Sequence, residues 1–283
     1  MKQKAIEIHH LLPEEFEYGE QNGFVYHYTN LNALINILNS KSIWLTAFHQ
    51  LNDLSEGRLL FEEIIRHLKV KQVNKIEIKL RKLFNKIIEN AYVVSFCSYG
   101  NKLSQWRGYG NINVGFNYEL ISNGQYFIVD KNGKHHYTSG LFFSKCDYIN
   151  PFEKQSLEIR IEESLNNFKD LENANIEDFS VFQYNALKLG LILFPVKHIG
   201  FLEESEYRAV HYLWNVLPFN HPCKDKLFIK LLFDTENVKR IVVGPSVEQP
   251  MISDKIIAYI EENNSIYGNV EVYNSKIPYL DNS

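Results

Sequence analysis

Three stretches of the sequence combine side chains that can bind or transform a ligand with positions in or beside predicted strands. They are Tyr26-His27-Tyr28-Thr29, the segment from Ser95 to Gly110, and the segment from Glu203 to Arg208. His27 can hydrogen-bond a ligand through either ring nitrogen. A single histidine in a strand is more often structural, so His27 needs partners from the other stretches before it indicates a site.

Glu206 is the residue best suited to chemistry in the third stretch. A carboxylate that opens a strand beside a pocket can stabilise a cationic, sugar-like transition state or accept a hydrogen bond from a ribose hydroxyl. The competing interpretation is that Glu203, Glu204 and Glu206 are surface acids and that Glu206 pairs with Arg208. Strand alternation places residues 204, 206 and 208 on one side, so both interpretations predict the same face.

Trp106 and Tyr109 lie in a polar, glycine-bearing loop that we predict over residues 99–111. Their rings suit stacking on a base or a nicotinamide, and they equally suit holding the loop against the core. Loops of this length between strands often carry function. The chain contains no GxSxG, no GxGxxG after a strand and no GxxxxGK[ST], which leaves no support for a serine hydrolase, a Rossmann site or a P-loop.

The cysteines and paired histidines show no metal-ligand spacing. Cys97, Cys146 and Cys223 are far apart and form no CxxC pair, which favours buried, reduced thiols. His9-His10 and His135-His136 are adjacent pairs without the spacing of a zinc site, and we interpret them as surface features. We therefore expect no metal.

Hydrophobic patterning predicts the order of elements along the chain. Apolar and β-branched runs predict strands at 24–28, 42–48, 92–97, 112–118, 207–214, 227–233, 240–244 and 270–273. Apolar residues at helical spacing predict helices at 31–38, 55–69, 71–89 and 250–263, and a helical region at 151–190. Asn132-Gly133 predicts a hairpin turn between 125–129 and 135–143.

This order favours an α+β protein with a split, mixed or antiparallel sheet and flanking helices. Most of the later strands are not separated by crossover helices, which argues against a doubly wound parallel sheet. We expect one domain, residues 1–283, with a helical insertion near 151–190. The net charge of −4 lacks the excess of basic residues found in dedicated nucleic-acid binders, although a local basic groove is compatible with it. No stretch has the pattern of a signal peptide or a membrane span, so we expect a cytoplasmic protein without a membrane partner.

Taken together, the motifs resemble a bacterial family known as domain of unknown function 2971. That family combines an aromatic Y-K/H-Y-T opening, a leucine-patterned helix, an N-D turn, an S-F-S strand, a W-x-x-Y loop before a G-x-x-x-F strand, and a late E-x-E-[YW]-R. The matching segments here are Tyr26 to Thr29, Leu31 to Leu38, Asn52-Asp53, Ser95 to Ser98, Trp106 to Phe116 and Glu204 to Arg208, followed by the closing strand Ile241 to Pro245.

The pattern is in turn similar to the ADP-ribosyltransferase superfamily, in which three strand-borne positions hold NAD in a split sheet. The resemblance implies His27 as the first position, with Tyr28 and Thr29 beside it, and Ser95 or Ser98 as the second. It implies Trp106 or Tyr109 as the ring that sandwiches the nicotinamide. Glu206 would stabilise the oxocarbenium-like transition state, and Glu204 would orient or deprotonate the acceptor.

The leading hypothesis is therefore an NAD-consuming ADP-ribosyltransferase, acting as a bacterial toxin or anti-phage effector on nucleic acid or protein, with a regulatory partner protein compatible with that role. The alternative is a non-catalytic sensor module that holds a nucleotide or a partner protein in the same pocket. A nuclease-like hydrolase is a weaker third hypothesis, because no acidic pair with metal-ligand geometry can be identified.

Overall fold

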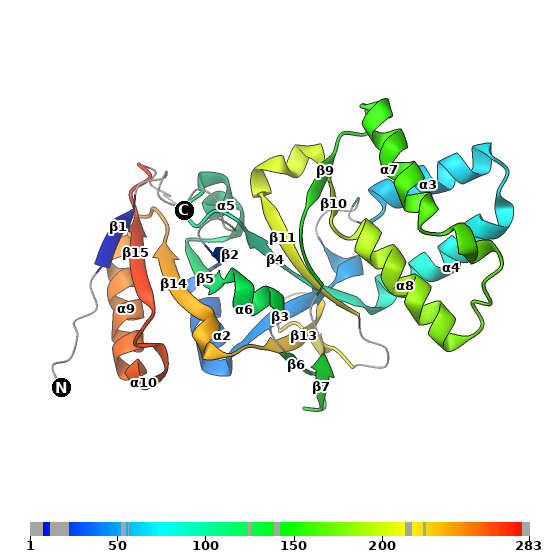
Figure 1. The fold of residues 1–283 in the computed structure, drawn as a ribbon. Coiled ribbons are helices and arrows are strands. Elements are labelled where there is room, and N and C mark those ends of the chain that lie inside the picture. Colours follow the sequence, from blue (N-terminus) through cyan, green and yellow to red (C-terminus); the bar gives the residue numbers. More distant parts are fainter. Residues whose placement is uncertain are drawn as a thin grey trace.

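The computed structural model describes residues 8–11, 23–51, 55, 57–123, 126–138, 142–212, 217–222 and 225–278. It shows an α+β fold in which a large mixed sheet carries helices on its faces and a lobe of helices at one end (Figure 1). Within these residues, no helix combines the length and the apolar character that crossing a membrane requires.

The strands and helices follow the predicted order closely. The strands are β1 (Ile8–Leu11), β2 (Phe24–Thr29), β3 (Ser42–Ala47), β4 (Ala91–Cys97), β5 (Ile112–Asn117), β6 (Tyr126–Val129), β7 (His135–Thr138), β8 (Phe142–Lys145), β9 (Asp147–Ile149), β10 (Val196–His198), β11 (Glu206–Tyr212), β12 (Phe219–Asn220), β13 (Leu227–Leu232), β14 (Val238–Val243) and β15 (Glu271–Ser275). The α-helices are α2 (Leu31–Ser40), α3 (Leu59–Val70), α4 (Asn74–Asn90), α5 (Leu103–Tyr109), α6 (Tyr118–Asn123), α7 (Lys154–Asn166), α8 (Phe179–Leu193), α9 (Gln249–Glu262) and α10 (Asn264–Tyr267). Short 3₁₀ helices are η2 (Phe48–Gln50), η3 (Lys169–Glu172), η4 (Ile199–Glu204) and η5 (Thr235–Asn237).

The sheet is mixed, and it is split at β4. The strand order is β1-β15-β14-β5-β2-β4-β3-β13-β6-β7, with β11 on β4 and β8 on β11; β1, β15 and β14 pair in parallel and the other pairs are antiparallel. β11 pairs with β4 along its whole length. On the other edge, β2 pairs with β4 only at Cys97, and β3 only at Tyr92 and Val93. β2 and β3 therefore diverge beside residues 94–96 of β4.

Two large apolar cores and a smaller cluster around Trp106 hold the described elements in place. One lies between the sheet and the helices α2 and α9, whose apolar stripes include Leu34, Leu38 and Ile256. The side chain of Asn30 caps α2 by accepting a hydrogen bond from the Ala33 amide at 3.0 Å.

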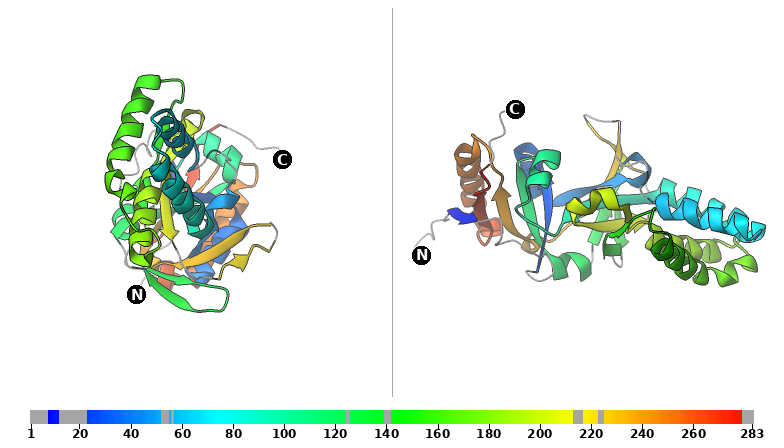
Figure 2. Two further views of the ribbon diagram at one scale, coloured as in Figure 1. Left: turned by 90° about the vertical axis from the view of Figure 1, so that its right-hand side faces the viewer. Right: turned by 90° about the horizontal axis from the view of Figure 1, so that it is seen from above.

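The second core belongs to a lobe of four helices, α3, α4, α7 and α8. Figure 2 shows this lobe projecting from the sheet as a paired stack of helices. Phe61 of α3 and Phe84 of α4 stack within it, with ring centroids 3.8 Å apart. The helical region predicted at 151–190 is therefore half of a larger lobe, and residues 59–90 supply the other half.

Some predicted boundaries were wrong. The predicted loop at 99–111 contains the helix α5. The second hairpin arm, predicted over 135–143, ends at Thr138. Phe142 begins a separate strand, β8, which pairs with β11. The short strands β1, β9, β10 and β12 carry too few residues to give a periodic signal. Asn52-Asp53, Gln125, residues 213–214 and Cys223 lie outside the described residues.

Lys79 joins the two halves of the helical lobe. Its ammonium donates hydrogen bonds to the carbonyls of Leu171, Glu172 and Ala174, at 2.9, 2.7 and 2.8 Å. We expect Lys79→Met to lower the free energy of unfolding by about 1–3 kcal/mol, because carbonyls satisfied by one side chain lose their donor. The measurement is chemical denaturation beside the control Lys75→Met, an exposed lysine on the same helix. Equal stability of the two variants would contradict this role.

Candidate functional site

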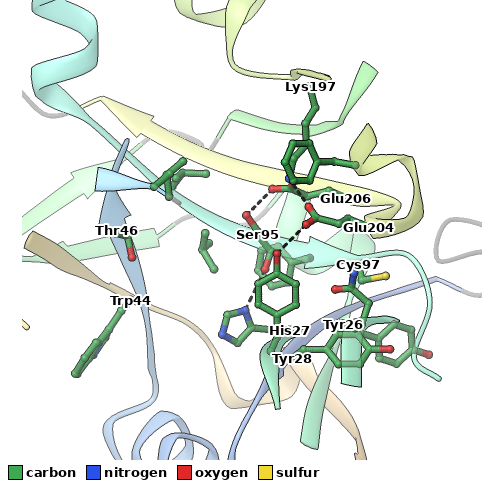
Figure 3. A pocket seen from close by; sticks show the side chains of 17 residues that line it. Tyr26, His27, Tyr28, Trp44, Thr46, Ser95, Cys97, Lys197, Glu204 and Glu206 are labelled. Atoms are coloured by element: carbon green, nitrogen blue, oxygen red, sulfur yellow. Dashed lines mark hydrogen bonds and ion pairs between the residues drawn. The ribbon is translucent and has the colours of Figure 1, made fainter. Parts of the chain in front are cut away.

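A pocket of about 300 Å³ lies where β2 and β3 part along β4. Its lining comes from β2, β3, β4, α5, β10, η4 and β11, and from Leu51 just after η2 (Figure 3). The lining residues are Tyr26, His27, Tyr28, Trp44, Thr46, Leu51, Val93, Val94, Ser95, Phe96, Cys97, Gln105, Tyr109, Lys197, Phe201, Glu204 and Glu206. The volume is at the lower end of the range for small-molecule sites.

His27 fills part of the gap between the strands. Its Nδ1 lies 3.0 Å from the carbonyl oxygen of Ser95, a backbone group in the stretch of β4 between its contacts with β2 and β3. Because a carbonyl only accepts, Nδ1 carries the proton and Nε2 carries a lone pair. Burial lowers the pKa of His27 and outweighs the Ser95 hydrogen bond, which raises it. The lowered pKa favours the neutral ring. His27 therefore offers a ligand an acceptor.

Glu206 is buried and its carboxylate is saturated with donors. Oε1 accepts hydrogen bonds from Ser95 Oγ at 2.5 Å and from Arg208 Nε at 2.7 Å. Oε2 accepts from Lys197 Nζ at 2.6 Å and from Arg208 Nη2 at 3.2 Å. A carboxylate offers about four lone-pair positions, so these donors use its capacity. A ligand hydroxyl could bond to Glu206 only by displacing one of them.

The charge of Glu206 is fixed by its neighbours. Burial alone would raise its pKa, but the positive charges of Arg208 and Lys197 and their hydrogen bonds outweigh this and lower the pKa to about 2. The pairing of Glu206 with Arg208 that the sequence suggested is confirmed. The interpretation of Glu206 as a surface acid was wrong, since only 3% of the residue is exposed.

Glu204 is the more accessible carboxylate. It ends η4 rather than standing in the strand, because Ser205 adopts a left-handed conformation (φ 45°) that separates it from β11. Its Oε1 accepts a hydrogen bond from Tyr109 Oη at 2.8 Å, and its Oε2 accepts one from Lys197. One lone-pair position on each oxygen stays available to a ligand.

Lys197 links the two carboxylates and was missed by the sequence analysis. Its ammonium bonds both Glu204 and Glu206 and lies 4.9 Å from the centre of the Phe201 ring. Figure 3 shows this group on the side of the pocket opposite His27. Lys197 stands on β10, a three-residue strand whose partner β9 lies some fifty residues earlier in the chain. No local pattern could have indicated that pairing.

The aromatic candidates separate into one at the pocket and one in the core. Tyr109 lines the pocket and is 49% exposed, and burial, together with the charge of Glu204, raises the pKa of its hydroxyl. Trp106 is buried: it packs edge-on against Tyr28, with centroids 4.5 Å apart, and covers Gly244, where a Cβ would lie 2.8 Å from the indole. Trp106 therefore positions α5 rather than facing the pocket.

The remaining predicted residues also divide. Tyr28 and Ser95 line the pocket, and Tyr28 donates a hydrogen bond to the carbonyl of Tyr99 at 2.8 Å. Ser98 is buried and donates to the carbonyl of Ser205 at 2.9 Å, which places its hydroxyl on the loop before β11. Thr29 borders a neighbouring cavity of about 130 Å³ that shares His27 and Trp44 with the pocket. Of the two candidate serines, Ser95 is the one that touches Glu206.

The described segments contain no candidate metal site. No group of three or more His, Cys, Asp or Glu side chains there is arranged to hold a metal ion. The lone thiol at the pocket, Cys97, is 2% exposed, and burial raises its pKa to about 12. It is therefore protonated at neutral pH and unsuited to act as a nucleophile.

Comparisons with known proteins support one part of the resemblance. Residues 105–209 match the sequence model of a family described as "Protein of unknown function (DUF2971)". The curated "Methyltransferase/ribosomally synthesized cyclic peptide gymnopeptides precursor gymMA1" of Gymnopus fusipes is 37% identical over 67 residues, which are 23% of this chain and 15% of that protein. The chain thus spans a small part of that relative. No solved structure is significantly similar to the chain.

Proposed function

We propose that the protein is an NAD-dependent ADP-ribosyltransferase, with a fold of that superfamily, and that it binds NAD between β2 and β3. The observation that supports this most is that residues from three distant stretches of sequence, His27, Tyr109 and Glu204, line one pocket beside the Ser95–Glu206 pair. The role as a cytoplasmic bacterial toxin or anti-phage effector is part of the same proposal. So is an acceptor that is a nucleic acid or a protein.

The pocket has complementary groups for the two ends of NAD. His27 Nε2 accepts a hydrogen bond from a hydroxyl of the adenosine-side ribose. Tyr109 and Phe201 enclose the flat nicotinamide ring near the carboxylates. The nicotinamide ribose then meets Glu204, the carboxylate that keeps free lone pairs.

The chemistry that fits these groups is cleavage of the bond between the ribose C1′ and the nicotinamide nitrogen. The bonding electrons leave with the nicotinamide, which departs neutral, and positive charge develops on the ribose. Glu204 stabilises that charge, and it takes the proton of the acceptor nucleophile as the new bond to C1′ forms. Glu206 positions these groups rather than reacting itself. Its carboxylate accepts hydrogen bonds that hold Ser95, Lys197 and Arg208 in place, and Lys197 in turn holds Glu204.

The direct test is the release of nicotinamide from NAD by the purified protein, with and without cell lysate as the source of acceptors. We expect nicotinamide release in step with transfer of labelled ADP-ribose to a component of the lysate. Neither free nicotinamide nor labelled product from a folded protein would refute the transferase.

The second candidate is a non-catalytic nucleotide-binding module. The saturation of Glu206 favours it, because Lys197 and Arg208 offset the charges of Glu204 and Glu206 and leave no net negative charge to stabilise an oxocarbenium ion. Isothermal titration calorimetry separates the two. Binding of NAD without turnover in the presence of lysate identifies the binding module, and turnover identifies the enzyme.

A further inference from the structure

An outward-facing row of aromatic side chains runs across four strands from the edge of the pocket. Residues directly opposite each other in an antiparallel pair project from the same face. Lys230 of β13 lies opposite Trp44 of β3 and opposite Val129 of β6. Leu232 lies opposite Phe127, and Phe127 lies opposite Tyr137 of β7. Trp44, Lys230, Phe127 and Tyr137 therefore share one face, which we call the aromatic face.

The aromatic face is on the solvent side of this half of the sheet. The alternate residues of the same strands, Leu45, Ile229 and Ile128, are fully buried in the core. Phe127 and Tyr137 are 45% and 57% exposed, which is unusual for large rings on adjacent strands. Exposed rings gathered in this way mark a surface that contacts another molecule.

The rings of this face contact one another and a cation. Trp44 stacks on Phe228 with ring centroids 3.9 Å apart, and Phe228 stacks on Phe219 of β12 at 5.2 Å. The ammonium of Lys230 lies 4.8 Å from the centre of the Phe219 ring. Further along the row, Phe127 and Tyr137 meet at 5.6 Å.

The strands of the aromatic face, β3, β13, β6 and β7, carry a cation, Lys230, and no acid. The turn between β6 and β7 exposes Lys131 and Lys134, while the turn's one acid, Asp130, is buried. Asp130 accepts hydrogen bonds from the amides of residues 132 and 134, and it pairs with His136 at 3.0 Å. A phosphate chain would thus meet cations on this face without facing a carboxylate from its strands.

We propose that the aromatic face binds single-stranded nucleic acid and leads it to the pocket. Stacking of bases on aromatic rings across adjacent antiparallel strands, with cations for the phosphates, is how sheet-based proteins hold single strands. Four strands span roughly 14 Å, at about 4.8 Å per step, which suits two or three stacked nucleotides. Trp44 and Thr46 belong both to β3 and to the pocket lining, so the row is continuous with the site.

This assignment deepens the proposed function, since it makes a single strand the acceptor, but the binding itself can be measured without NAD. The probe is a labelled oligonucleotide of about 12 nucleotides, in oligo-dT and oligo-rU forms, followed by fluorescence anisotropy at low salt. We expect the wild type to bind one or both, with affinity falling as salt rises. The two probes distinguish DNA from RNA.

Three variants on the aromatic face and one control make the test specific. Phe127→Ala and Tyr137→Ala remove exposed rings, and each weakens binding on the order of tenfold through the loss of a stacked base. Lys230→Gln weakens binding. It also lowers the slope of log affinity against log salt concentration by about one, as expected for the loss of one phosphate contact. Tyr184→Ala, on the exposed side of α8 in the helical lobe, leaves binding unchanged.

The proposal is overturned if the wild type binds neither oligonucleotide at low salt. It is also overturned if Phe127→Ala and Tyr137→Ala bind as the wild type does, since binding would then lie elsewhere. Oligonucleotide binding that depends on these rings, in a protein that does not consume NAD, would refute the transferase and leave the aromatic face as assigned.

Discussion

Glu206→Gln is expected to lower the free energy of unfolding by about 3–5 kcal/mol, because it leaves the buried charges of Lys197 and Arg208 without their shared partner. Glutamine has the shape of glutamate, but its NH2 group is a donor. That group would face the hydrogen-bond donors of the network in place of a carboxylate oxygen that accepts from them. The measurement is chemical denaturation, with Glu203→Gln as the control. Glu203 is exposed and three residues away in the chain, so its variant should fall within about 0.5 kcal/mol of the wild type.

The same network predicts how stability depends on pH. The pKa of Glu206 is about 2 in the folded protein, below the value of about 4.3 for an unfolded chain. The unfolded state therefore takes up a proton first as the pH falls, so the stabilisation is complete above about pH 4.3 and is lost toward pH 2. Glu206→Gln should remove this part of the acid dependence. A stable Glu206→Gln protein with an unchanged acid transition would contradict the role given to the network.

Glu204→Gln is expected to slow nicotinamide release by about 10²–10⁴-fold, because it removes the carboxylate assigned to the acceptor's proton and to the developing ribose charge. Glu204 is partly exposed, with 20% of its side chain accessible, so the variant should fold. NAD affinity should change little, because the proposed contacts to the adenosine half and to the nicotinamide ring lie on other residues of the pocket. The experiment combines single-turnover kinetics with calorimetric NAD binding.

This variant is a cleaner test of chemistry than Glu206→Gln, whose loss of activity would be mixed with loss of stability. Glu203→Gln again serves as the control and should keep the wild-type rate. Wild-type turnover by Glu204→Gln would exclude the assigned role, and loss of turnover together with loss of the folded state would place Glu204 in the structural network.

Local patterns were sufficient for the elements that carry most of the site. The aromatic and β-branched run before Asn30 predicted β2, and the leucine spacing after it predicted α2, so His27 was correctly expected near the end of a strand. Glu206 was likewise expected at the start of β11. These features depend on neighbours in the sequence, which is the information that periodicity contains.

The features that the sequence could not indicate depend on contacts between distant segments. Lys197 reaches Glu206 only because β10 pairs with β9, and neither strand has more than three residues. The burial of Trp106 depends on Gly244, more than a hundred residues later, which leaves room for the indole. The choice of Ser95 over Ser98 depends on the register of β4 against β11, in which Arg208 lies opposite Ser95. Such contacts are set by packing, which a single sequence does not display.

The central claim is that NAD binds in the gap between β2 and β3 with its reactive ribose at Glu204. A crystal structure of the protein with a hydrolysis-resistant NAD analogue tests it most directly. We predict a ribose hydroxyl of the nicotinamide half within hydrogen-bond distance of Glu204, about 3 Å, and the adenosine-side ribose at Nε2 of His27. An analogue bound outside this pocket, or with its nicotinamide half turned away from Glu204, would contradict the account.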